Sequence, residues 1–277
     1  MTTVENRKMD EERALYGSSD ITVIGCQFDG PADGESALKE CSNVTVKDSF
    51  FNLRYPFWHV HGLNIDNSEM TDKCRAALWY SDNINISNTD LHGIKALREC
   101  RNVKIDNSSI ISPEFGWSVT GLKMTNTTAE SEYFLMRSSD IVLDNFTLKG
   151  KYSFQYDENL TITNSELNTK DAFWHAKNVT VKDSVINGEY LAWYSENLTL
   201  INCTIRGTQP LCYCKGLKLI DCEMADCDLA FERSEVEATI TTPVISIKNP
   251  LAGHIHVPAA GEIIRDIPGA DAEIILG

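Results

Sequence analysis

The chain has 277 residues, 42% of them hydrophobic, and its formal net charge is −15 at pH 7. Such acidity excludes nucleic acid and anionic membranes as partners, because both are bound through a basic surface. It also argues against bare polyanionic sugars, unless a divalent cation bridges them to the protein.

Residues 1–20 are predicted to cap the N-terminal end of a repeat domain. A stack of parallel strands without a cap would expose unpaired backbone groups and the end of its core. Residues 1–16 contain no apolar run of the kind that a secretory signal or a membrane span requires. The chain as written is therefore expected to be cytoplasmic.

A short apolar pattern recurs from Ile21 to Val236. We take the first apolar residue of each copy as its anchor, and from Val103 onward successive anchors are always 19 residues apart. The anchors are Ile21, Val44, Leu63, Ile84, Val103, Leu122, Ile141, Leu160, Val179, Leu198, Leu217 and Val236. A period sustained over this length indicates a repeat architecture. Surplus residues around positions 30–34 predict an external loop in the first coil.

Aligned copies separate into columns of apolar residues and columns of turn residues. Apolar residues stand two and seven positions after the anchor and six before it, which predicts short strands with one buried face. Asn, Asp or Gly stand one position before the anchor and four after it. These residue types tolerate left-handed backbone dihedrals at sharp bends, and stacked Asn side chains can bond to one another.

Three short strands in each 19-residue coil predict an all-β fold, a right-handed single-stranded parallel β-helix. The twelve anchors correspond to about 11–12 coils over residues 21–240. A leucine-rich repeat horseshoe is the alternative with a similar period. It is disfavoured because no helical stretch fits between the copies.

The Asn-lined pattern stops after Ile240, and four Pro residues divide 241–277 into short apolar pieces. This tail is predicted to form a C-terminal cap of edge strands, where Pro is tolerated. Within it, His254 and His256 share one face of a strand, either as a solvated pair or as a metal chelate. The whole chain, 1–277, is expected to form a single β-helix domain.

The nine Cys are odd in number, and most occupy repeat columns of small residues. They are interpreted as packing residues in a reducing compartment. A thiol metal site formed by Cys212, Cys214, Cys222 and Cys227 is the alternative, although paired C-x-x-C spacing is lacking. We therefore expect no metal site and no cofactor.

Several segments carry a family resemblance: EERALY (11–16), GESALKE (34–40), PFWH (56–59), SIKNPLAGHI (246–255) and GEIIRD (261–266). With them the chain resembles the uncharacterised bacterial family named domain of unknown function 3737, a relative of the pectate-lyase-like β-helices. The resemblance covers nearly the whole chain. It implies the pectin-lyase-like solenoid fold, and it implies no activity.

All five Trp fall in one column, five residues before the anchor. Lys39, Arg98 and Gln155 share that column, so it is not fully buried. The next column holds His, Tyr, Glu and Arg residues and is predicted to sit half-exposed at a bend. We call the two columns together the aromatic flank. Its predicted ligand-binding residues are Lys39, Trp58, Trp79, Tyr80, Trp117, Trp174, His175, Trp193, Tyr194 and Tyr213.

Exposed aromatic side chains with interleaved charges are typical of a groove that holds an extended ligand such as a carbohydrate. Two alternatives remain open. The rings could be a ladder that stiffens the solenoid, because stacked side chains stabilise neighbouring strands. The protein could also be a structural or assembly protein without catalysis, joined into a homo-oligomer.

An enzymatic alternative places a polysaccharide lyase or glycoside hydrolase site at the N-terminal part of the flank. His59 would act as acid or base with Glu99 or Glu40 as its carboxylate partner. Arg98 or Arg137 would stabilise developing negative charge. The acidic triads of polygalacturonase-like β-helices are missing, as is a stacked Asp cluster that would hold Ca²⁺.

Overall fold

The structure, a computed structural model, describes residues 2–29 and 35–277. The loop expected around residues 30–34 lies outside these ranges. Backbone contacts divide the chain into two compact units, Met1–Ile141 and Val142–Gly277, which we describe in turn. No helix of the described residues is long and apolar enough to cross a membrane.

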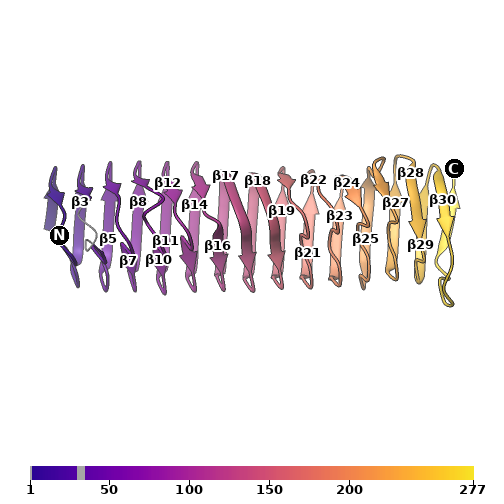
Figure 1. Cartoon of the computed structure of the whole chain (residues 1–277), viewed down its shortest axis with the longest axis horizontal. Helices are drawn as coiled ribbons and strands as arrows, with labels where there is room; N and C mark the ends of the chain where they lie inside the picture. Colours follow the sequence, from indigo (N-terminus) through magenta and orange to yellow (C-terminus); the bar gives the residue numbers. More distant parts are fainter. Residues whose placement is uncertain (1, 30–34) are drawn as a thin grey trace. The chain divides into compact units, whose positions relative to one another are not determined.

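Unit 1 is a parallel β-helix in which each coil pairs with the next coil (Figure 1). Its strands are β1 (Thr2–Glu5), β2 (Lys8–Met9), β3 (Ser19–Ile24), β4 (Gln27–Phe28), β5 (Ser42–Lys47), β6 (Phe50–Phe51), β7 (Phe57–Trp58), β8 (His61–Asp66), β9 (Glu69–Met70), β10 (Leu78–Trp79), β11 (Asp82–Ser87), β12 (Asp90–His92), β13 (Leu97–Arg98), β14 (Arg101–Asp106), β15 (Ser109–Ile111), β16 (Glu114–Trp117) and β17 (Thr120–Met136). The anchor residue of one coil pairs with the anchor residue of the next coil, as Ile21 does with Val44 and Val103 with Leu122. The register therefore follows the sequence repeat.

Unit 2 continues the same strand pattern within itself. Strand β18 (Ser139–Gln155) begins just before the unit boundary; the others are β19 (Glu158–Thr163), β20 (Glu166–Asn168), β21 (Lys177–Lys182), β22 (Val185–Asn187), β23 (Glu196–Ile201), β24 (Thr204–Thr208), β25 (Leu217–Cys222), β26 (Cys227–Asp228), β27 (Glu235–Ile240), β28 (Val244–Lys248), β29 (Ala252–Val257), β30 (Ala260–Ile264) and β31 (Glu273–Leu276). Strands β28 and β30 form a separate parallel pair. The predicted parallel β-helix is confirmed in each unit.

The apolar columns form the core, as predicted. Every residue of the column six before the anchor is buried, from Leu38 to Ala230. Phe rings of this column stack across coils, with ring centroids 4.8 Å apart for Phe154 and Phe173. Burial of each large side chain contributes about 1.5–3 kcal/mol, so this column is a main source of stability.

The two turn columns adopt the left-handed backbone that their residue types predicted. The φ angles are 47° for Asn67, 54° for Asn83 and 55° for Asn178. Their side chains also bond along the coils, and Asn178 Nδ2 donates to Asn159 Oδ1 at 3.1 Å. The predicted Asn ladder is confirmed.

Replacing Asn178 with alanine is expected to lower the free energy of unfolding by about 1–2 kcal/mol. Alanine strains the left-handed backbone, and it loses the amide bonds to Asn159 and from Asn197. Asn178→Gly keeps the backbone relaxed and serves as the control, so it should cost less. Urea unfolding curves compare the variants, and equal loss in both would contradict the backbone contribution.

The parallel ladder extends beyond the coils predicted over 21–240, into both segments expected to be caps. Strand β1 pairs with β3, and strands β29 and β31 continue the ladder after β27. The sequence pattern did not reveal the coil in the tail, because a glycine, Gly253, stands at the anchor position opposite Val236. A Cβ at Gly253 would lie 2.0 Å from the Val236 carbonyl oxygen, so no apolar anchor fits there. The β-helix therefore has more coils than the 11–12 expected. That residues 1–277 form a single domain stays a prediction.

The nine cysteines are free and buried, which agrees with a packing role. Their thiols donate to backbone carbonyls, as Cys212 Sγ does to Gln209 O at 3.4 Å and Cys214 Sγ to Ala192 O at 3.2 Å. Burial raises the pKa of Cys100 and of Cys212 to about 12. Within the described ranges no group of three or more His, Cys, Asp or Glu could hold a metal ion.

Candidate functional site

The outer column of the aromatic flank adopts a left-handed backbone from Glu40 to Tyr213, a feature that sequence reasoning missed. The φ angles are 59° for Glu40, 53° for His59, 55° for Tyr80, 55° for His175 and 62° for Tyr194. Bulky side chains rarely occupy this region. The half-exposed bend predicted for this column is thus a further left-handed corner of the coil, built mainly from aromatic and charged residues.

The Trp column of unit 1 is a stack. The rings of Trp58 and Trp79 lie face to face, 5.2 Å apart at an interplanar angle of 3°. Each indole N–H donates to a carbonyl of the next coil, Trp58 to Ala76 O at 2.6 Å and Trp79 to Lys95 O at 2.9 Å. The Lys39 ammonium lies over the Trp58 ring at 5.5 Å. Because neighbours cover the ring faces, the Trp side chains present mainly their edges outward.

Arg98 continues this stack by inserting between two Trp rings. Its guanidinium carbon lies 5.0 Å from the Trp79 ring centroid and 5.5 Å from that of Trp117. Such cation–π contacts contribute about 0.5–1 kcal/mol when exposed and more when desolvated. Arg98 Nε is also 3.5 Å from Glu99 Oε1. The predicted charge-stabilising residue is therefore held within a packed column.

The predicted catalytic residues are not joined into an acid–base pair. The His59 ring stacks on Tyr80, with centroids 5.1 Å apart, and Tyr80 stands between His59 and Glu99 along the column. Glu40 lies on the other side of His59, one coil earlier, and Arg137 is exposed two coils beyond Glu99. Among these described side chains, no hydrogen bond or ion pair connects His59 to either carboxylate. The catalytic assignment stays a prediction.

Unit 2 carries two ladders of rings. Trp174 and Trp193 stack at 5.4 Å and 2°. In the outer column, His175 lies 4.9 Å from Tyr156 and 5.0 Å from Tyr194. Tyr194 stacks in turn on Tyr213 at 4.8 Å. Four rings therefore follow one another along this edge.

The outer ladder of unit 2 is accessible. Tyr156 is 49% exposed and Tyr194 is 45% exposed. Burial, and then the Glu232 carboxylate, raise the pKa of the Tyr213 phenol above its usual value. The phenol therefore remains a hydrogen-bond donor throughout the neutral range. The arrangement offers a row of polar ring edges to a ligand in solvent.

Further aromatic residues support the flank, and sequence reasoning did not select them. The Tyr55 ring lies 4.6 Å from Trp58, and the Tyr190 ring lies 5.4 Å from Trp193. Both stand three residues before their Trp, and both have positive φ angles, 58° and 56°. The recurring Tyr-x-x-Trp spacing was the sequence signal that could have found them. Each of these Tyr rings packs against the Trp of the same coil and so supports the Trp column.

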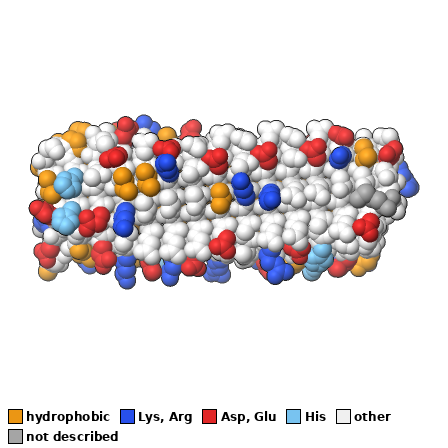
Figure 2. All heavy atoms as spheres, turned by 180° about the vertical axis from the view of Figure 1, so that it is seen from behind, with side chains coloured by type: hydrophobic (Ala, Val, Ile, Leu, Met, Phe, Trp, Pro, Cys, Tyr) orange, Lys and Arg blue, Asp and Glu red, His pale blue; other side chains and the backbone are white. Residues whose placement is uncertain are grey.

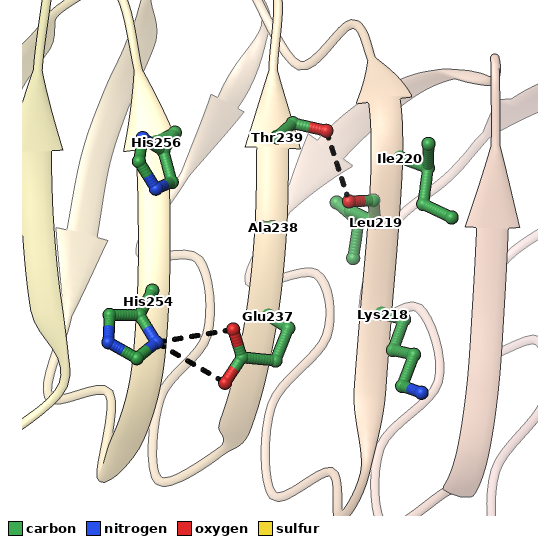
Figure 3. Close-up of a pocket in the computed structure, with 8 residues that line it drawn as sticks. All are labelled: Lys218, Leu219, Ile220, Glu237, Ala238, Thr239, His254 and His256. Carbon is green, nitrogen blue, oxygen red and sulfur yellow. Dashed lines mark hydrogen bonds and ion pairs between the residues drawn. The ribbon is translucent and has the colours of Figure 1, made fainter.

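A separate groove of about 460 Å³ lies on the outer face of β25, β27 and β29 in unit 2 (Figure 3). His254 Nδ1 lies 3.2 Å from Glu237 Oε2, while its Nε2 lies 3.5 Å from Glu273 Oε2. Both ring nitrogens thus face carboxylates, and His254 and His256 are exposed on the same strand face. The two His thus stand as an exposed pair, and His254 has acidic neighbours on both sides.

The surface charge is mixed rather than sorted by sign. On the face drawn in Figure 2, acidic and basic side chains are interspersed. Ion pairs join neighbouring coils, such as Lys170 Nζ and Glu189 Oε2 at 2.9 Å or Lys177 Nζ and Glu196 Oε2 at 3.6 Å. Exposed pairs of this kind contribute little to stability. The aromatic columns are the more distinctive surface.

A family model described as "Protein of unknown function (DUF3737)" matches residues 2–275. No curated protein sequence matches the chain. Among solved structures, the chain is similar to the A-module of the Azotobacter vinelandii mannuronan C-5 epimerase AlgE6. That likeness has 13% identity and a TM-score of 0.43, and it covers 94% of this chain and 90% of the other.

The chain is also similar to PfbA, a surface adhesin of Streptococcus pneumoniae, at 14% identity and a TM-score of 0.35. The match covers 87% of this chain and 70% of PfbA. A tailspike protein of the E. coli bacteriophage HK620, solved in complex with a hexasaccharide, matches at 10% identity and a TM-score of 0.34. It covers 93% of this chain and 65% of the tailspike. Likenesses this low concern the fold alone.

Proposed function

We propose, on the premise that the chain belongs to the DUF3737 family of proteins of unknown function, that its aromatic flank binds an extended carbohydrate. The observation that carries the proposal is the exposed ladder of Tyr156, His175, Tyr194 and Tyr213, held at left-handed corners.

The stacking keeps the outer ladder ordered while its ring edges stay in solvent. A left-handed backbone costs a non-glycine residue about 1–2 kcal/mol. Each aromatic stack returns about 0.5–1.5 kcal/mol, so a ring with two stacked neighbours, such as Tyr194, can recover that cost. The ladder is therefore held in place before any ligand binds, and the exposure of Tyr156 and Tyr194 leaves their hydroxyl groups available to it.

The direction of the stacking favours a long ligand over a small one. The rings cover one another's faces along the coils, so a ligand meets phenol hydroxyls and imidazole edges one coil apart. Neighbouring strands are about 4.8 Å apart, which sets the repeat of these polar groups. A chain of sugar units with repeated hydroxyl groups can pair with several of them at once. A glycan array probed with the intact protein tests this directly.

Tyr194→Phe is expected to weaken binding of a glycan identified on that array by about threefold to tenfold. The substitution removes one hydroxyl and leaves the ring stacked between His175 and Tyr213. Isothermal titration calorimetry measures the change. Tyr152→Phe is the matched control, because Tyr152 lies in the same unit and stands eight residues before its anchor, outside the two columns of the flank. Equal affinity of both variants and the wild type would count against the outer ladder as the binding surface.

The assembly alternative predicts a different outcome. An array without binding across a broad set of neutral glycans, together with a stable dimer in light scattering, would favour subunit joining. Binding of any extended glycan by a protein that is a monomer in solution would favour the aromatic flank as a carbohydrate-binding surface.

A further inference from the structure

The outer ladder of unit 2 repeats at a nearly constant distance. Ring centroids lie 4.9 Å apart for Tyr156 and His175, and 5.0 Å apart for His175 and Tyr194. Tyr194 and Tyr213 follow at 4.8 Å. The interplanar angles of these three pairs are 9°, 8° and 13°, so the rings are close to parallel. A ligand lying along the ladder therefore meets one ring edge at each coil that it passes.

The ladder also has a definite length. In the outer column, Arg137 precedes Tyr156 and Glu232 follows Tyr213, and neither of these two residues carries a ring. The Glu232 carboxylate is paired with Lys248 Nζ at 3.2 Å, and both side chains are largely covered. This ion pair closes the C-terminal end of the row. Four ring edges are therefore available, which gives four positions for a repeating ligand.

The spacing of the rings indicates which sugar chains match it. In a 1→4-linked pyranose with two equatorial glycosidic bonds, the bonds leave from opposite ends of the ring. Each sugar then advances the chain by about 5 Å, close to the spacing of about 4.8 Å between strands. Successive sugars of such a chain stay in register with successive coils, whereas an axial bond at the anomeric carbon makes the chain curve. A β-(1→4)-linked chain of glucose or mannose therefore contacts every ring edge in turn.

A second column, beside the ladder, repeats every two coils. Two residues after each ring the side chains alternate in charge; they are Glu158, Lys177, Glu196 and Lys215. Backbone pairing places these residues next to one another on successive coils. In a straight β-(1→4)-linked chain each sugar is rotated by about half a turn relative to the one before, so one side of the chain also repeats every two sugars. Alternating acceptors and donors match that repeat, and equal numbers of carboxylate and ammonium groups favour an uncharged chain.

We infer that the outer ladder of unit 2 binds a neutral β-(1→4)-linked chain of glucose or mannose, with one sugar at each of its four rings. The three phenol hydroxyls and the His175 imidazole form hydrogen bonds with sugar hydroxyls, and the alternating column contacts alternate sugars. The inference rests on the proposed carbohydrate binding and names its substrate class and its number of subsites.

Cellotetraose and maltotetraose provide the first test, by calorimetry on the full chain. Both contain four glucose units joined 1→4, and they differ only in the configuration of the linkage. We expect cellotetraose, or the β-(1→4)-linked tetrasaccharide of mannose, to bind about tenfold more tightly than maltotetraose, because the curved chain loses one or two hydrogen bonds. In the preferred series, affinity should rise with each sugar up to the tetrasaccharide and change little from there to the hexasaccharide.

Two variants separate an end subsite from a central one. Tyr213 is the last ring, so Tyr213→Phe should lower the affinity for the tetrasaccharide to about that for the trisaccharide and leave the trisaccharide within about twofold of its wild-type affinity. Three sugars cover Tyr194 wherever they lie on the four rings, so Tyr194→Phe should weaken binding of both. Tyr152→Phe, outside the two columns of the flank, is the control and should change neither affinity.

Equal affinity for the β-linked tetrasaccharides and for maltotetraose would overturn the inference and leave carbohydrate binding intact. Binding only to glycans of other linkages would do the same. An affinity that keeps rising beyond four sugars, or a Tyr213→Phe variant that weakens the trisaccharide as much as the tetrasaccharide, would contradict the four subsites. Absence of binding to every glycan tested would refute both this inference and the proposed function. Circular dichroism of each variant shows that the comparison is made on folded protein.

Discussion

Phe173→Ala is expected to lower the free energy of unfolding by about 3–5 kcal/mol. The Phe173 side chain is fully buried, and its ring stacks on Phe154 at 4.8 Å. The substitution removes the transfer energy of the ring and leaves a cavity that the rigid coils on either side cannot close. Alanine also keeps the left-handed backbone at φ 59° without the packing that stabilises it.

Urea unfolding monitored by far-ultraviolet circular dichroism measures this effect. Phe173→Leu retains most of the apolar volume and is the control, so it should cost clearly less than alanine. A loss below about 1 kcal/mol for Phe173→Ala would equal a typical surface substitution. That result would mean that the inward Phe column is not the core.

Gly188→Ala is expected to destabilise the protein by more than about 4 kcal/mol or to prevent folding. A Cβ at Gly188 would lie 1.7 Å from the Thr169 carbonyl oxygen of the preceding coil, and the φ angle there is +153°. Neither atom belongs to a flexible side-chain end. The coils would have to separate, which breaks the ladder between β20 and β22.

Gly269→Ala provides the matched control within the same unit. Gly269 also has a positive φ angle, +76°, but no atom lies within 4 Å of its added Cβ. Only the backbone term of about 1–2 kcal/mol applies there. Thermal unfolding of both variants separates the clash from the dihedral cost, and similar melting temperatures would exclude the close approach of the coils.

Much of the fold could be predicted from the sequence because the coil repeats its chemistry. Apolar residues such as Leu63 and Phe154 recur at positions that must face inward, and both are fully buried. Asn67 and Asn178 recur where a left-handed bend is needed, and both have positive φ angles. Periodicity averages over many copies, so a single irregular residue does not obscure the column.

The ends of the ladder could not be predicted for the same reason. A coil is recognised by its anchor, and in the tail Gly253 replaces the apolar anchor because the Val236 carbonyl leaves no room for a side chain. At the other end, Thr2 stands opposite Ile21, so the first strand does not show the apolar pattern. At both ends the anchor position lacks an apolar residue, and the reason can be seen only in the packing against the neighbouring coil.

The residues of the candidate site could be predicted from the sequence, but the way in which their side chains pack could not. The column position of Trp58 and Trp79 follows from spacing, yet their face-to-face packing depends on the register between coils. The same register inserts Arg98 between two rings and stacks Tyr80 on His59, which separates His59 from Glu99.

Titration of the intrinsic Trp fluorescence with the strongest glycan from the array tests the central claim most directly. Trp193 contacts Tyr194 and Tyr213 and stacks on Trp174, so a ligand bound along the outer ladder of unit 2 changes the surroundings of these two Trp. The proposal predicts a saturable change in emission that is smaller for a short oligosaccharide than for a long one of the same sugar. An emission spectrum unchanged at saturating glycan, with binding confirmed by calorimetry, would place the ligand elsewhere and contradict the account.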